Sequence, residues 1–143
     1  MTIKVALAGA GAFGIKHLDG IQNIPDVEVV SLISRDLAKT QEVADKYGIP
    51  HVTTKLEDSL AIKEVDAVIL CTPTQMHASQ SIACMEAGKH VQVEIPLCDI
   101  LSEGQAVVNL QKQTGLVAMC GHTRRFNPSH QYVHKKIKAG EFN

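Results

Sequence analysis

The sequence predicts an α/β fold, a doubly wound parallel sheet of about six strands with helices on both faces. Two observations predict this class. Six short apolar segments alternate with segments of helical periodicity along the whole chain, and a glycine-rich turn joins the first apolar segment to the first helical one. Parallel strands need such helical crossovers, which are right-handed and cover the sheet. The length of 143 residues suits one domain with a buried core.

The first strand and the turn after it carry the most informative motif of the chain. Residues 3–8 form an apolar run, and a Gly-x-Gly-x-x-Gly motif follows it and opens a helix that continues to about residue 21. In dinucleotide-binding sites of the Rossmann type, the first glycine permits a tight turn, the second lets a pyrophosphate approach the backbone, and the third lets the helix pack closely on the strand. The amides at the helix start then bind the phosphates. The predicted phosphate-binding loop comprises Gly9, Ala10, Gly11, Ala12, Phe13 and Gly14.

The composition excludes several other classes of function. The formal net charge of −1 provides no basic field for nucleic acid. No secretory signal opens the sequence and no run reaches the roughly 18 apolar residues of a membrane span, so we expect a cytoplasmic protein without nucleic-acid or membrane partners. The cysteines form no Cys-x-x-Cys pair, which favours reduced packing residues over a disulfide framework or a zinc site. They are Cys71, Cys84, Cys98 and Cys120.

The end of the second strand, predicted over residues 27–33, decides which dinucleotide we expect. Sites specific for NAD usually place Asp or Glu here, about 20 residues beyond the glycine motif, where the carboxylate accepts hydrogen bonds from the adenosine ribose. This chain has Ser34 and Arg35 instead, and both side chains can donate to a 2′-phosphate. We therefore predict NADP, with Arg35 as a solvated loop charge the alternative. Asp36 is expected to cap the next helix in either case.

The middle of the chain supplies the next crossovers. A helix over residues 36–47 is expected to end at Gly48, followed by a short strand over 49–53 and a small helix over 56–61. Residues 66–70 are too apolar for a half-exposed strand and too short for a helix, so they predict a fourth strand buried on both faces.

The carboxyl end of this fourth strand is expected to line the cofactor, because ligands of open parallel sheets bind beside the switch in strand order. Cys71, Thr72 and Pro73 stand there. Thr74 follows them, and its side chain can cap the helix that continues to about residue 87 as well as contact the cofactor.

The last third of the chain contains two more strands. Residues 90–94 predict the fifth, and Glu94 at its end either lies near the nicotinamide ribose or caps the following loop. Ser102 and Gln105 form a capping-box pattern ahead of a helix that Gly115 stops. The sixth strand is expected over residues 116–120, and a final helix reaches about residue 139.

Two alternative readings of these features remain open. His130 and His134 stand one helical turn apart, but without an intervening HExxH glutamate or a clear third ligand they favour a solvated helix face, and we predict no metal site. A non-catalytic dinucleotide sensor is the alternative function, although such a sensor has no need for the motifs between residues 94 and 128. A methyltransferase is another class with a glycine-rich loop after a strand, but the third glycine and the Ser34-Arg35 pair favour a ligand that contains a pyrophosphate.

Four motifs together make the chain resemble the glucose-fructose oxidoreductase, inositol dehydrogenase and rhizopine-catabolism (Gfo/Idh/MocA) family. They are the glycine motif, Cys-Thr-Pro-Thr-Gln-Met-His at 71–77, Glu-Ile-Pro at 94–96 and Gly-His-Thr-Arg-Arg-Phe-Asn-Pro at 121–128. The resemblance covers essentially the whole chain. It implies an NADP-dependent dehydrogenase of aromatic-compound and lignin breakdown that acts on a carboxylated semialdehyde. It further implies that His77, Glu94 and Pro96 contact the cofactor and that the bond before Pro96 is cis.

The expected substrate contacts follow from the charge of such a substrate. Its carboxylates need cationic partners, and Arg124, favoured over Arg125, and His122 are the local ones. His122 and His77 are candidates for proton transfer, with surface and packing roles as the alternatives.

The chain departs from the family pattern in two ways. Ile95 stands where most members have a lysine close to the reacting carbon, and Ile95 cannot transfer a proton. Family members also continue into a second domain that carries further catalytic groups and the interface of a homo-oligomer. We therefore expect residues 1–121 to form an NADP-binding domain and residues 122–143 to lead into an absent substrate domain, which holds the general base, so that this fragment alone is inactive.

Overall fold

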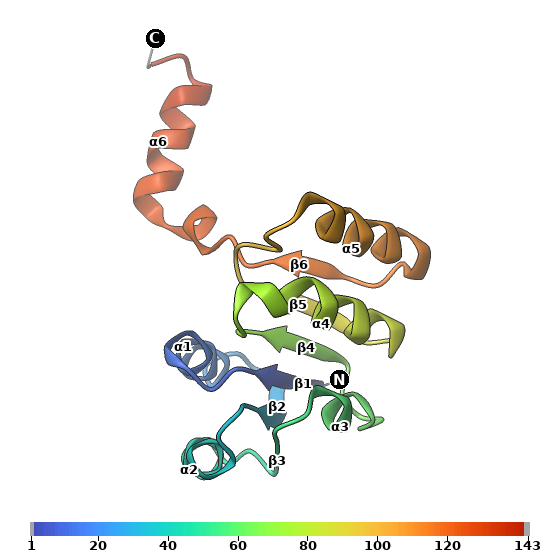
Figure 1. Cartoon of the computed structure of the whole chain (residues 1–143). Coiled ribbons are helices and arrows are strands. Elements are labelled where there is room, and N and C mark those ends of the chain that lie inside the picture. The colour runs from blue at the N-terminus through green and yellow to red at the C-terminus, as the bar shows by residue number, and fades with distance from the viewer. Residues whose placement is uncertain (1, 142–143) are drawn as a thin grey trace.

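A computed structural model describes residues 2–141 and confirms the predicted class. Six parallel strands form one sheet in the order β3-β2-β1-β4-β5-β6, the strand order of a Rossmann fold (Figure 1). The strand order reverses between β1 and β4, and this point is where open sheets bind ligands. The strands are β1 (Ile3–Ala8), β2 (Val27–Ile33), β3 (His51–Thr53), β4 (Ala67–Leu70), β5 (His90–Val93) and β6 (Ala118–Cys120).

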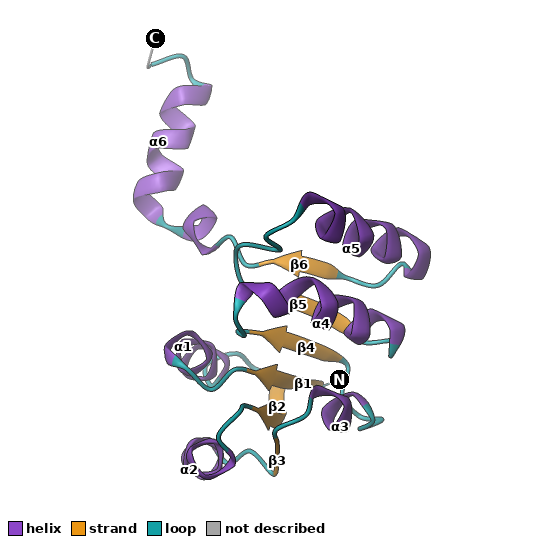
Figure 2. Ribbon diagram, in the orientation of Figure 1, coloured by secondary structure: helices purple, strands orange, loops and turns teal. Residues whose placement is uncertain are grey.

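Helices connect and cover these strands (Figure 2). They are α1 (Ala12–Ile21), α2 (Leu37–Tyr47), α3 (Leu56–Leu60), α4 (Thr74–Glu86), α5 (Leu101–Thr114), the 3-10 helix η1 (Thr123–Phe126) and α6 (Pro128–Lys138). The predicted ends of α2 are confirmed. The Lys39 amide donates to the Asp36 side chain over 3.2 Å, and Gly48 takes the left-handed conformation, with φ of +69°, that ends a helix.

Two predicted helix starts are wrong. Thr74 does not cap α4, because the helix already includes it and Pro73 occupies the capping position. Ser102 does not cap α5 either, since the helix begins one residue earlier, with Ile100 at the capping position and no side-chain bond there. In both cases the residue of capping type falls inside the helix, as its first residue in α4 and its second in α5.

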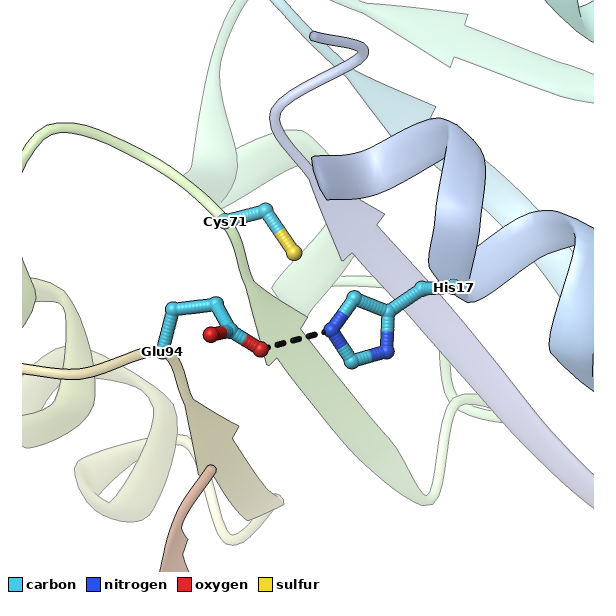
Figure 3. A group of neighbouring side chains, drawn as sticks. All are labelled: His17, Cys71 and Glu94. Atoms are coloured by element: carbon cyan, nitrogen blue, oxygen red, sulfur yellow. Dashed lines mark hydrogen bonds and ion pairs between the residues drawn. The ribbon is translucent and has the colours of Figure 1, made fainter. Parts of the chain in front are cut away.

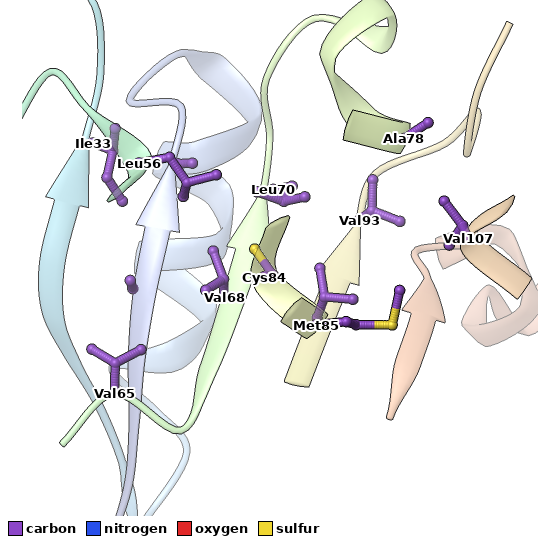
Figure 4. Close-up of a cluster of buried hydrophobic side chains, with 13 residues drawn as sticks. Ile33, Leu56, Val65, Val68, Leu70, Ala78, Cys84, Met85, Val93 and Val107 are labelled. Carbon is purple, nitrogen blue, oxygen red and sulfur yellow. The ribbon is translucent and has the colours of Figure 1, made fainter. Parts of the chain in front are cut away.

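The core lies in two layers, one on each face of the sheet. On one face, α3, α4 and α5 cover buried side chains of β1, β4 and β5, among them Val68, Leu70 and Val93 (Figure 4). On the other face, α1 and α2 cover a smaller cluster around Leu7 and Leu32. Alternation along β1 explains the division, because successive side chains of a strand point to opposite faces. The strand predicted over residues 66–70 forms as β4, but full burial on both faces is not borne out: Val68 and Leu70 are buried on one face, whereas Ala67 and Ile69 on the other are only half-buried and Asp66 is exposed.

The chain after β6 leaves the sheet. Helix α6 extends away from the other elements (Figure 1), and none of its residues is buried. His130 and His134 are exposed on it, as the solvated-face reading expects. The division of the chain near residue 121 stays a prediction. Among residues 2–141, none of the helices combines the length and the apolar character needed to cross a membrane.

Candidate functional site

The register of the sheet brings the predicted site residues to one edge. Ala8 pairs with Ile33 and with Leu70, Leu70 pairs with Val93, and Val93 pairs with Cys120. The residues that directly follow these strand ends therefore form a row across the carboxyl edge of the sheet. They are Gly9, Ser34, Cys71, Glu94 and Gly121. Residues separated by more than a hundred positions in sequence thus meet at one edge.

A cavity of about 590 Å³ opens at this edge. Most of the predicted cofactor-binding residues line it, namely Gly9, Ala10, Gly11, Ser34, Arg35, Cys71, Thr72 and Pro73. Its wall also includes residues that sequence reasoning missed, in particular Thr54 and Lys55, from the turn between β3 and α3, and Gln80 of α4. Thr72 Oγ1 donates to Gln80 Oε1 over 2.6 Å, so these two wall residues hold each other in place. The other predicted cofactor residues, Ala12, Phe13, Gly14, His77, Glu94 and Pro96, lie outside this wall.

The three glycines of the motif are required for different structural reasons. Gly9 has φ of +106°, and a Cβ atom there would lie 2.4 Å from the Cys71 carbonyl oxygen. A Cβ on Gly14 would lie 1.8 Å from the Gly9 carbonyl oxygen, so α1 can approach the turn only without a side chain. Gly11 is extended and faces open space, with no atom within 4 Å of a Cβ position. The first and third glycines serve the fold, whereas the second leaves room for a ligand.

The Arg35 end of the cavity is cationic. Arg35 and Lys55 both line it and are exposed, with Glu57 the one acidic lining residue. Within residues 2–141, the Arg35 guanidinium has no hydrogen-bond or ion-pair partner. The carboxylate of Asp36 is bound at the start of α2, and the hydrogen bond from the Lys39 amide lowers its pKa. Asp36 thus caps α2 through one carboxylate oxygen, Oδ1.

A partly buried polar cluster lies further along the row, where β4 and β5 end (Figure 3). His17 of α1 donates from Nε2 to Oε1 of Glu94 over 2.7 Å, and the Cys71 side chain lies beside this pair. Glu94 is only 9% exposed. Sequence reasoning missed His17, since nothing local connects it with a residue 77 positions away.

His17, Cys71 and Glu94 are of types that bind metal ions, and their polar atoms all lie within 4.8 Å of one another. The distance of 2.7 Å between Nε2 and Oε1 is that of a hydrogen bond. Burial, with a smaller contribution from the Glu94 charge, raises the pKa of the Cys71 thiol to about 12. We therefore interpret the cluster as a hydrogen-bonded pair with a neutral thiol beside it.

The neutral thiol leads to a prediction about reactivity. In the folded chain at pH 8, iodoacetamide should modify Cys71 at least tenfold more slowly than in the urea-unfolded chain, because the raised pKa leaves little thiolate. Peptide mass spectrometry over a time course measures both rates. The same shift should lower stability as pH rises from about 9 to about 12, since only the unfolded chain releases the proton in that window. Equal labelling rates in the two states would contradict the assignment.

His77 is 1% exposed, and both of its ring nitrogens face backbone carbonyls. Nδ1 lies 2.7 Å from the Pro96 oxygen and Nε2 lies 2.7 Å from the Thr72 oxygen. This environment favours the packing alternative over proton transfer, because neither nitrogen is free for a ligand. The imidazole instead ties the segment after β4 to the segment after β5. The bond between Ile95 and Pro96 is cis, as the resemblance implied.

The predicted substrate contacts lie beyond the cavity wall. His122 precedes η1 and Arg124 and Arg125 belong to it, and all three are exposed. They follow Gly121, whose amide donates to the Val93 carbonyl, so they start from the carboxyl edge of the sheet next to Glu94. Their roles toward a substrate stay predictions. The four cysteines are free thiols, as expected.

Comparisons with known proteins agree with this architecture. A family model described as "Oxidoreductase family, NAD-binding Rossmann fold" (GFO_IDH_MocA) matches residues 3–122. The chain is 65% identical over 139 residues to 4-carboxy-2-hydroxymuconate-6-semialdehyde dehydrogenase of Sphingobium sp. (strain NBRC 103272 / SYK-6), a match that covers 97% of this chain and 44% of that protein. It is 31% identical over 140 residues to scyllo-inositol 2-dehydrogenase (NAD(+)) of Bacillus subtilis (strain 168), over 97% of this chain and 41% of that one.

Solved structures show the same fold. The crystal structure of scyllo-inositol dehydrogenase from Lactobacillus casei, with bound cofactor NAD(H) and scyllo-inositol, matches with a TM-score of 0.92 and 25% identity. That match covers 99% of this chain and 42% of the other. The chain thus spans less than half the length of each of these relatives.

Proposed function

Because this chain belongs to the Gfo/Idh/MocA family of oxidoreductases with an NAD-binding Rossmann fold, we propose that it forms the NADP-binding part of a dehydrogenase. The proposed reaction is oxidation of the cyclic hemiacetal of 4-carboxy-2-hydroxymuconate semialdehyde to 2-pyrone-4,6-dicarboxylate, in protocatechuate 4,5-cleavage. The identity of 65% to the Sphingobium dehydrogenase supports this substrate. The match covers 44% of that protein, so the activity of the whole enzyme is part of the proposal.

The single observation that carries the choice of NADP is the chemistry of the Arg35 end of the cavity. Arg35 and Lys55 supply two cations, and no carboxylate stands at the end of β2 to accept hydrogen bonds from a ribose. Asp36, the next carboxylate along the chain, accepts a hydrogen bond from the Lys39 amide at the start of α2. A guanidinium binds a phosphate dianion through charge-assisted hydrogen bonds, whereas a carboxylate would repel it.

The rest of the cavity fits the remainder of a dinucleotide. The open space at Gly11 and the amides at the start of α1 suit a pyrophosphate. Thr72 and Pro73 form the wall on the β4 side, and Glu94 lies further along the row. When bound, NADP would supply the hydride acceptor. The contribution of this chain is then to hold the cofactor and to orient its nicotinamide end toward the substrate.

The substrate contacts in this proposal are Arg124 and His122. Both start from the same strand edge as Glu94 and are exposed. A guanidinium can hold a substrate carboxylate in a fixed orientation. Ile95 has no titratable group, so the proton of the substrate hydroxyl must pass to a residue elsewhere.

Replacement of Arg35 tests the cofactor assignment. Wild-type chain should bind NADP more tightly than NAD, and Arg35→Ala should weaken NADP binding roughly 10- to 100-fold, the usual effect of losing a hydrogen bond to a charged group. NAD binding should change little, because NAD lacks the 2′-phosphate. Isothermal titration calorimetry at fixed ionic strength measures the four dissociation constants.

Lys63→Ala is the matched control, since it removes one exposed positive charge outside the cavity wall. It should leave both affinities unchanged. The NADP assignment is wrong if wild-type chain binds NAD as tightly as NADP, or if Arg35→Ala leaves the NADP affinity as it was.

A further inference from the structure

His17 lies beside Glu94 at the carboxyl edge of the sheet, and the proposed function gives it no role. It lies on α1, three residues beyond the glycine motif, and its side chain is 24% exposed. Its Nε2 lies 2.7 Å from Oε1 of Glu94 (Figure 3). A carboxylate can only accept a hydrogen bond, so Nε2 is the donor.

Glu94 needs such a donor. A carboxylate that is 9% exposed loses much of its hydration, and its burial is costly unless hydrogen bonds replace the lost water. Among residues 2–141, His17 is the one hydrogen-bond donor to the Glu94 side chain. The backbone position of Glu94 is fixed separately, because its amide donates to the Leu70 carbonyl.

The carboxylate is also confined on its other sides. A Cβ on Gly121 would lie 3.0 Å from Oε1, so the neighbouring segment leaves no room for a side chain beside this oxygen. The Cys71 thiol, kept neutral by its raised pKa, lies close by and adds no charge. Oε1 therefore lies between the His17 imidazole and the Gly121 segment.

The second oxygen, Oε2, remains available. It makes no hydrogen bond within the described residues. Among these residues, the side-chain N and O atoms that are fully buried and lack a partner are Ser81 Oγ and Gln92 Oε1. Since Oε2 is not one of them, it keeps access to solvent. A carboxylate held through one oxygen and open through the other is an acceptor with a fixed direction. Its position in the row, beyond the loop that suits the pyrophosphate, is at the nicotinamide end of a bound dinucleotide.

We propose that His17 is a positioning residue of the cofactor site, which holds Glu94 through Oε1 so that Oε2 can accept a hydrogen bond from the nicotinamide half of the dinucleotide. This inference rests on the proposed cofactor-binding function. It predicts that the loss of the His17 donor affects the nicotinamide half of the ligand and not the adenosine half.

The experiment compares two ligands and two substitutions. The ligands are NADPH and 2′-phospho-ADP-ribose, which lacks the nicotinamide. His17→Leu removes the donor, whereas His17→Gln keeps an N–H group on a side chain of similar reach. His17→Leu should weaken NADPH binding about tenfold and leave 2′-phospho-ADP-ribose binding unchanged, while His17→Gln should restore NADPH binding to within about threefold of wild type. Fluorescence of the reduced nicotinamide measures NADPH binding, and calorimetry measures binding of the other ligand.

His130→Leu is the matched control, since it removes an exposed histidine of α6. It should change neither affinity. The inference is wrong if His17→Leu binds NADPH like wild type, if it loses both ligands equally, or if His17→Gln is as weak as His17→Leu. Failure of the wild-type chain to bind either ligand is a separate result, which would refute the proposed cofactor-binding function itself.

Discussion

Gly14→Ala should lower the free energy of unfolding by about 3 kcal/mol or more, a large share of the total stability of a domain of this size. The added methyl group would lie 1.8 Å from the Gly9 carbonyl oxygen and 3.2 Å from Leu7 Cδ2. Backbone atoms cannot move aside as a flexible side chain can. Helix α1 must therefore shift away from β1, which also opens the smaller core cluster around Leu7 and Leu18.

Urea denaturation followed by far-ultraviolet circular dichroism measures this effect. Gly20→Ala is the matched control, because Gly20 belongs to the same helix and has no atom within 4 Å of a Cβ position. Alanine favours a helix over glycine, so this control should keep or raise the stability by up to about 1 kcal/mol. Equal denaturation midpoints for the two variants would show that α1 does not pack as described.

Gly11→Ala should have the opposite profile, with stability retained and dinucleotide binding lost. The residue has φ of −81° and ψ of −168°, which alanine adopts without strain, and a methyl group would meet no protein atom. The denaturation midpoint should therefore stay close to that of wild type. The methyl group would occupy the space that the pyrophosphate needs, so NADPH affinity should fall roughly 10- to 100-fold, as expected for overpacking of about 1–3 kcal/mol.

NADPH fluorescence titration measures this loss, with Gly20→Ala again as the control. Because Gly11→Ala should fold normally, a weaker affinity reports on the ligand site itself. Unchanged NADPH affinity would mean that the pyrophosphate does not lie against Gly11.

The fold could be predicted because its determinants are local. Apolar runs of strand length, glycine at helix ends, and the glycine motif act within a few residues of one another, and strand order follows from the right-handed crossovers. Asp36 and Gly48 were predicted correctly for this reason, since a cap bonds to its own helix. Thr74 and Ser102 show where local patterns fail. A residue of capping type caps a helix only if it stands at the position just before the first turn. In this chain Pro73 and Ile100 stand there instead, and the path of the loop that decides this depends on tertiary contacts.

The candidate site was predictable in part for the same reason. Residues that directly follow a strand share the carboxyl edge of the sheet in any register, which is why Ser34, Arg35, Cys71, Thr72 and Pro73 could be named. Lys55 and His17 could not. Lys55 reaches the cavity from the turn between β3 and α3, and His17 contacts Glu94 across the space between α1 and β5. These contacts depend on the relative positions of elements that the sequence pattern does not specify.

The imidazole of His77 links two segments whose backbones border the site from different strands. A neutral imidazole carries one N–H group, so at any moment it donates to the carbonyl of either Thr72 or Pro96, and both oxygens lie at 2.7 Å. Displacement of either segment would pull on the same rigid ring. The wall that contains Thr72 and the loop that follows Glu94 should therefore move together, so that a displacement at the carboxyl end of β4 is transmitted to the carboxyl end of β5.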